Sequence, residues 1–128
     1  MIVDTSALVA VTFREPDHQE LIAKLAGAPS AGIGTPTLAE TGLVLASRLG
    51  QDSRDLVIRL LGEFGIEEIP FGDQHWREAV DAYLRFGRGR HKARLNFGDC
   101  LAYATARVAG RPLLATGHDF SQTDLPLA

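Results

Sequence analysis

The sequence has little cysteine, no long apolar run and no basic leader. Cys100 is the only cysteine among 128 residues, so no intramolecular disulfide can form and nothing indicates an oxidising compartment. No segment approaches the roughly 18 consecutive apolar residues that span a bilayer. The acid Asp4 interrupts the N-terminus before any apolar segment, which argues against a signal peptide. These absences predict a cytoplasmic protein that does not enter a membrane.

The composition is that of an ordinary globular protein. Hydrophobic residues make up 45% and charged residues 23% of the chain, which leaves no reason to expect disorder. The length suits one hydrophobic core, and no repeat or linker divides the chain, so we expect a single domain over residues 1–128. The net charge of −3 means that any binding of nucleic acid must rely on a local basic cluster.

Short apolar segments alternate with amphipathic ones along the whole chain. Strands are expected at 1–3, 30–34, 66–70 and 113–115. Helices are expected at 16–26, 35–49 and 53–64, from Asp73 past Tyr83, and from Asn96 to Gly110. Parallel strands joined through helices require right-handed crossovers and a sheet that is covered on both faces. The sequence therefore predicts an α/β fold, a three-layer α/β/α sandwich around a mostly parallel sheet.

Four acids stand where strands end or helices begin. They are Asp4 after the first strand, Glu40 early in the second helix, Asp99 at the start of the last helix, and Asp119 after the last strand. In parallel sheets the usable crevice lies beyond the carboxyl ends of the strands, so these acids can meet there. Two carboxylates about 4 Å apart repel by roughly 4 kcal/mol at an effective dielectric near 20. Hard oxygen ligands without Cys or His favour Mg²⁺, for which Mn²⁺ can substitute, as the ion that offsets this repulsion.

Each acid also has a purely structural explanation. Asp99 can complete a capping box with Asn96, Asp119 can form a turn, and Glu40 can be a solvated helix residue. Asp4 is harder to explain in this way, because it directly follows a buried strand. If the acids do gather around divalent ions, the chemistry they support is hydrolysis of phosphodiesters.

Four sequence blocks resemble those of VapC-type PIN domains, the ribonuclease toxins of toxin–antitoxin pairs. The resemblance spans nearly the whole chain, in blocks that begin at Ile2, Thr37, Leu95 and Pro112. It implies a PIN-like fold and a metal-dependent endoribonuclease that cuts tRNA, rRNA or mRNA and is inhibited by a VapB-type antitoxin. It also implies a homodimer formed through helices, for which the apolar stripes at 56–64 and 38–49 are candidate surfaces.

The resemblance also implies roles for individual residues. Asp4, Glu40 and Asp99 match the three acids that hold the metal, and Asp119 matches a fourth acid, for which Asp124 is the nearby competitor. Three further residues are expected to support these acids: Ser6, Asn96 and Thr116.

A basic segment leads directly into the last acidic helix. Five of the 13 Lys and Arg residues fall within ten positions, and no acid lies between Asp81 and Asp99. They are Arg85, Arg88, Arg90, Lys92 and Arg94, and with Gly87 and Gly89 they predict a flexible loop that binds RNA phosphates. The alternative is a solvated loop without a ligand. Nothing resembles an aromatic platform for bases, and the aromatic residues at 76, 83 and 86 are expected in the core or in a subunit contact, of which we favour the core. The histidines at 18, 75 and 118 receive no role.

Two other functions compete with the ribonuclease. A phosphatase or phosphotransferase could use Asp4 as a covalent nucleophile, although no second acid follows two residues later. A PIN-like chain could also act as a binding protein without catalysis, although all four acids are present.

Overall fold

A computed structural model describes residues 1–128 and shows a four-stranded sheet with the strand order β3-β2-β1-β4. Every pairing in the sheet is parallel, and Ile2 aligns with both Gly32 of β2 and Leu113 of β4. The strands are β1 (Ile2–Val3), β2 (Ala31–Gly34), β3 (Ile66–Ile69) and β4 (Leu113–Leu114). The parallel sheet that the sequence predicts is confirmed, with β3 at one edge.

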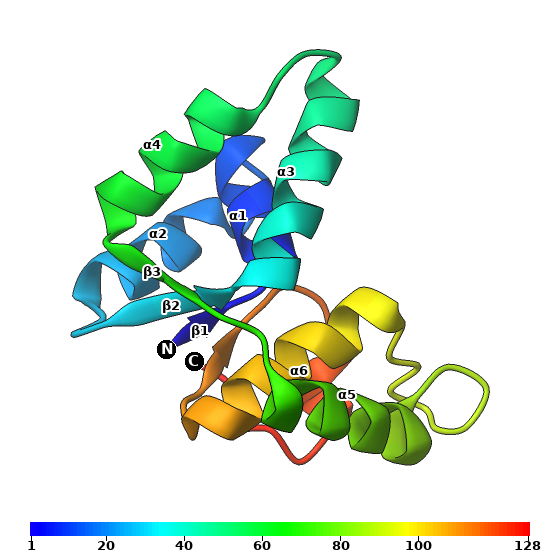
Figure 1. Ribbon diagram of the computed structural model, residues 1–128. Coiled ribbons are helices and arrows are strands. Elements are labelled where there is room, and N and C mark those ends of the chain that lie inside the picture. Colours follow the sequence, from blue (N-terminus) through cyan, green and yellow to red (C-terminus); the bar gives the residue numbers. More distant parts are fainter.

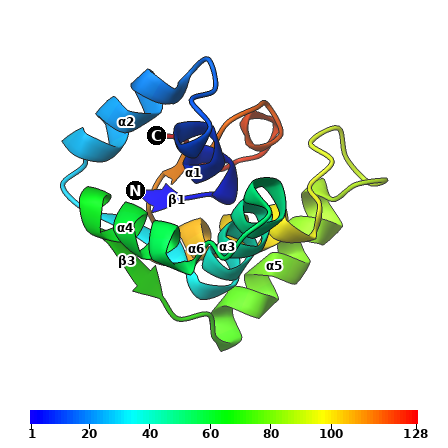
Figure 2. The ribbon, with the colours of Figure 1, turned by 90° about the horizontal axis from the view of Figure 1, so that it is seen from above.

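Six helices, α1 to α6, cover the two faces of this sheet (Figures 1 and 2). One group comprises α1 (Thr5–Thr12), α2 (His18–Gly27), α3 (Thr35–Leu49) and α4 (Arg54–Phe64). The other comprises α5 (Asp73–Phe86) and α6 (Phe97–Ala109), and a short 3₁₀ helix (Phe120–Gln122) follows β4. The three-layer α/β/α arrangement is therefore confirmed. No helix has both the length and the apolar character that crossing a membrane would require.

Successive side chains of a strand point to opposite faces of the sheet, so the hydrophobic core has two parts, one on each face. Ile2 and Leu113 pack in the cluster that contains residues of α5 and α6. Their neighbours Val3 and Leu114 point the other way and pack with residues of α1 and α2. Both sides of the central strands are buried, as continuous apolar strands in a parallel sheet require.

Helix α1 is an element that the sequence pattern did not predict. Its residues Ala7 to Ala10 are all buried, so the helix shows no polar face and no period of 3.6 residues. Asp4 is its N-cap: the carboxylate accepts a hydrogen bond from the backbone N–H of Ser6. The helix thus begins directly after β1, and the acid at the strand end is held by the turn that starts the helix.

Helix α5 presents a different face to the core than its aromatic residues suggest. Ala82 and Phe86 are buried, whereas Trp76 is 49% and Tyr83 is 44% exposed. The expectation that Trp76 and Tyr83 lie in the core is wrong, and only Phe86 satisfies it. Ala82 and Phe86 belong to the same apolar cluster as Tyr103 of α6, so the buried face of α5 combines a small residue with one large ring.

Candidate active site

Asp4 is the most buried of the four acids, with 5% of its surface exposed. Its Oδ2 accepts hydrogen bonds from Ser6 Oγ at 2.7 Å and from the Ser6 backbone nitrogen at 3.1 Å. The backbone N–H of Thr116, just after β4, donates to Ser6 Oγ at 3.0 Å. Burial raises the pKa of Asp4, the bonds from Ser6 oppose this rise, and the nearby Glu40 carboxylate adds to it. A relay from Thr116 through Ser6 therefore orients the carboxylate of Asp4.

Glu40 extends from the second turn of α3 towards the start of α6. Thr5 Oγ1 donates a hydrogen bond to Glu40 Oε1 at 2.7 Å, which ties the carboxylate to the residue that follows Asp4. The Glu40 carboxylate also lies against Gly98, so close that a Cβ at position 98 would collide with it. The Glu40 carboxylate therefore lies between the first residues of α1 and the first residues of α6.

Asp99 opens helix α6 and takes part in a capping box. Its backbone N–H donates to Asn96 Oδ1 at 2.9 Å, and its own Oδ2 accepts from the Asn96 backbone nitrogen at 3.1 Å. Its pKa is raised to about 6, mainly by burial and also by the charges of Asp4, Asp119 and Glu40, while the hydrogen bond from Asn96 opposes the rise. The charges of Asp4, Glu40 and Asp119 therefore reach Asp99, although the four acids come from distant parts of the sequence.

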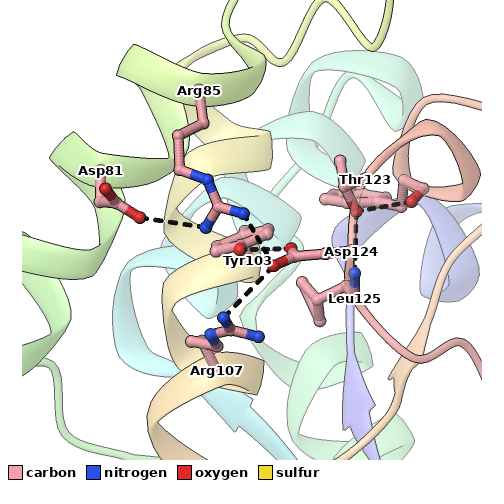
Figure 3. Close-up of polar contacts among 8 residues, drawn as sticks. Asp81, Arg85, Tyr103, Arg107, Thr123, Asp124 and Leu125 are labelled. Carbon is pink, nitrogen blue, oxygen red and sulfur yellow. Dashed lines mark hydrogen bonds and ion pairs between the residues drawn. The ribbon is translucent and has the colours of Figure 1, made fainter.

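The structure separates the two candidates for the fourth acid. Asp119 is exposed and lies near enough to Asp99 to raise its pKa. Asp124 is instead held by Tyr103 Oη at 2.6 Å, Arg85 at 2.9 Å and Arg107 at 3.3 Å (Figure 3). Burial works against ionisation of Asp124, but these three partners outweigh it and lower its pKa. Asp124 therefore fastens the C-terminal segment to α5 and α6.

The four acids have no cationic partner within the protein. None of the ion pairs includes Asp4, Glu40, Asp99 or Asp119. As the side chains lie, no three Asp, Glu, His or Cys residues are grouped closely enough to hold a metal ion. An all-oxygen set of acids, in which Asp4 and Asp99 have raised pKa values, nevertheless suits a hard divalent cation, and the metal-binding role of these residues stays a prediction.

The basic segment forms a loop that projects from the molecule beside the start of α6 (Figure 1). Arg88, Arg90, Lys92 and Arg94 are exposed and take part in no ion pair. Arg85 differs, because it belongs to the last turn of α5 and is paired with Asp81 and Asp124. Four of the five predicted cations are thus free to meet a ligand.

The loop is more firmly held than its glycines suggest. Hydrogen bonds join Arg88 N to the Leu95 carbonyl and Leu95 N to the Phe86 carbonyl, which closes the base of the loop. Ala93 and Leu95 are buried, and the His91 ring packs edge-on against Phe86. The loop is therefore anchored at its base, while its charged side chains point outwards.

Two residues of the site were missed in the sequence. Thr5 donates a hydrogen bond to the Glu40 carboxylate. Its position directly after Asp4 is the sequence feature that could have identified it. Gly98 leaves the space that this carboxylate occupies. A glycine inside the first turn of a helix is unfavourable by itself, and that cost was a sign that something packs closely against it.

Comparison with known proteins identifies the family. The PIN domain model matches residues 1–125. Ribonuclease VapC36 of Mycobacterium tuberculosis is 49% identical over 126 residues, which cover 98% of this chain and 91% of the relative. Ribonuclease VapC of Mycolicibacterium smegmatis is 38% identical and is covered to 97%. The chain belongs to the PIN-domain family and, within it, to the VapC ribonucleases.

Solved structures share the fold at lower sequence identity. The chain matches VapC20 of Mycobacterium tuberculosis, described as a toxin that cleaves the sarcin–ricin loop, with a TM-score of 0.78, 20% identity and coverage of 99% and 97% of the two chains. It matches a chain of a toxin–antitoxin complex from Klebsiella pneumoniae with a TM-score of 0.71, 19% identity and coverage of 99% and 95%. These likenesses support the assignment of the fold.

Proposed function

We propose that this chain is a divalent-metal-dependent endoribonuclease of the cytoplasm, whose site consists of Asp4, Glu40, Asp99 and Asp119. The observation that supports the proposal is that Asp4, Glu40 and Asp99 stand at the starts of helices or early in them, linked through Thr5 and Gly98, and none of the four acids has a cationic partner. Their oxygens would hold Mg²⁺ or Mn²⁺. When bound, such an ion supplies the positive charge that activates water and stabilises a phosphodiester under attack.

Within this proposal, the chain's own residues have distinct tasks. Asp4 and Asp99 present carboxylates from the ends of two rigid elements, and Ser6 fixes the orientation of Asp4 with support from the backbone of Thr116. Thr5 holds Glu40 in place. Burial of Asp4 and Asp99 disfavours their charged forms, so binding of a cation is coupled to release of protons from this site.

The deciding experiment replaces single acids and follows RNA cleavage. Asp4→Asn should abolish cutting of RNA in Mg²⁺ or Mn²⁺, because an amide cannot provide an anionic ligand. Asp124→Asn is the matched control, since this acid binds Tyr103 and two arginines outside the site, and it should retain cleavage. Asp119→Asn should impair cleavage. Mapping of cut ends in total RNA after brief expression would also identify the substrate among tRNA, rRNA and mRNA.

The same assay separates the competing functions. Release of inorganic phosphate from a phosphomonoester without any cutting of RNA would favour a phosphatase that uses Asp4 as nucleophile. Undiminished toxicity of both Asp4→Asn and Asp99→Asn would remove the metal-nuclease mechanism and favour a protein that acts by binding alone.

The exposed loop cations are proposed to hold RNA phosphates beside the acids. Each phosphate contact contributes to the salt dependence of binding. Arg88→Ala combined with Arg90→Ala should therefore weaken RNA binding and reduce the slope of log affinity against log salt, measured by fluorescence anisotropy. An unchanged slope would show that the loop does not contact phosphate.

A VapB-type antitoxin and a second copy of the chain are the proposed protein partners. The inward sides of the stripes at 38–49 and 56–64 pack in the core through Leu45, Val57 and Leu60. Their outward sides leave Leu43 73% and Ile58 67% exposed along a groove of about 700 Å³ between α3 and α4. An apolar groove of this kind suits a protein segment. Co-purification with the product of a small upstream reading frame tests the antitoxin.

A further inference from the structure

We propose that a nucleobase of the RNA substrate stacks on Phe97, in a pocket that lies between α5 and α6 beside the acids. The inference rests on the proposed ribonuclease function and deepens it. Phe97 is 81% exposed, the largest exposed fraction among the large apolar side chains. It is also the first residue of α6, two positions before Asp99. A large aromatic ring left in water at this place has no structural purpose in the chain itself.

The pocket has the size and lining of a site for a flat ligand. Its volume is about 580 Å³, within the usual range for small-molecule sites. Tyr83, itself 44% exposed, and Phe97 contribute aromatic rings, and Val80 and Leu101 contribute apolar walls. Every base has a π-face that can stack on such rings.

The polar groups of the pocket favour an anionic chain with acceptor groups. Arg88 lines the pocket without an ion-pair partner, and the Arg90 guanidinium lies 5.2 Å from the Tyr83 ring centre. Asn96 uses its carbonyl oxygen to cap α6, so its NH₂ group is available as a donor. No acid lines the pocket. These cations complement the phosphates of RNA.

The start of α6 connects the pocket with the acids. Residues two positions apart project from different sides of a helix, so Phe97 and Asp99 flank the same first turn. An RNA strand that crosses this end of α6 can present one phosphate to the acids and the adjoining base to Phe97. The N-terminus of the helix itself favours the phosphate.

The test combines binding and cleavage with three substitutions of Phe97. A short single-stranded RNA carrying 2-aminopurine is bound to the Asp4→Asn protein, in which stacking quenches its fluorescence. Phe97→Ala in the same protein should abolish the quenching. In the otherwise unchanged enzyme, Phe97→Ala should raise KM for a labelled RNA about tenfold, within the range of base–aromatic stacking. Phe97→Trp should restore both signals, and Phe97→Leu, which keeps apolar volume but has no ring face, should not.

Control measurements distinguish a failure of the proposed stacking pocket from a failure of the proposed ribonuclease function. Leu84→Ala removes an exposed apolar side chain of α5 that does not line the pocket, and it should leave KM and quenching unchanged. If wild type cuts RNA and Phe97→Ala cuts it with the same KM, the stacking pocket is refuted while the ribonuclease stands. If Phe97→Ala changes only the sedimentation coefficient, the pocket binds a second copy and the inference is also overturned. If wild type cuts no RNA at all, the proposed function itself has failed.

Discussion

Asp99→Asn should stabilise the metal-free protein while removing its nuclease activity. Folding buries part of this carboxyl near Asp4, Asp119 and Glu40, and its pKa rises from 3.8 to about 6. At neutral pH the folded protein must therefore hold a charge that it disfavours. The asparagine side chain removes the charge but keeps an oxygen that can accept the hydrogen bond from the Asn96 backbone, so the helix cap is preserved.

The sign and size of the effect follow from the pKa. A carboxyl whose pKa is raised by folding contributes stability that is fully present below its unfolded pKa and is lost as the pH rises through about 6. The shift corresponds to about 3 kcal/mol at neutral pH. Because Asp99 is partly exposed, solvent screening reduces this cost to about 1 to 2 kcal/mol. Asp99→Asn should therefore raise the melting temperature by about 4 to 8 °C.

Thermal unfolding of both proteins in EDTA measures this difference. The gain in melting temperature should be largest at about pH 7.5 and fall by about half at about pH 5, where the wild-type carboxyl is mostly protonated. Mg²⁺ or Mn²⁺ should then stabilise wild type more than the variant, because binding of a ligand to the folded state raises stability. An Asp99→Asn protein that melts at or below the wild-type temperature at neutral pH would refute the repulsion, as would a gain that does not change with pH.

Three further substitutions probe the supports of the site and of the fold. Ser6→Ala removes the 2.7 Å hydrogen bond to Asp4 and should lower metal affinity by about tenfold, measured by titration calorimetry. Gly98→Ala should displace the Glu40 carboxylate and reduce kcat, while circular dichroism and melting temperature stay at wild-type values or rise, because alanine is the better helix former. Asp124→Asn should lower the free energy of unfolding in urea by about 1 kcal/mol, since its ion pairs are partly exposed, and leave kcat unchanged.

The sequence predicted those strands and helices whose short-range sequence signals agree with how they pack in the structure. The run Ile2–Val3 followed by an acid indicated a buried strand that ends at Asp4, and the structure contains that strand. Asn96 and Asp99 have the spacing of a capping box and so predicted the start of α6. Both hydrogen bonds of this capping box are present. Short-range chemistry of this kind does not depend on what packs from elsewhere.

Features set by distant contacts were not predictable in the same way. Helix α1 is buried on several sides and so lost the polar face that reveals a helix. Trp76 and Tyr83 recur at helical spacing, but α5 turns its small Ala82 and Phe86 towards α6 instead. Periodicity shows that a helix has two faces; which face is inside depends on the shape of its neighbour. The space at Gly98 likewise exists only because α3 brings Glu40 there.

The four acids lie at positions 4, 40, 99 and 119, so a long stretch of the polypeptide is needed to bring them together. If they form the catalytic centre, a chain still emerging from the ribosome is harmless until residue 119 has been made, and proteolytic fragments that lack one of the four acids cannot cut RNA. A cell that produces such a toxin thus gains an interval between the start of synthesis and the first possible damage, during which a neutralising protein can be waiting.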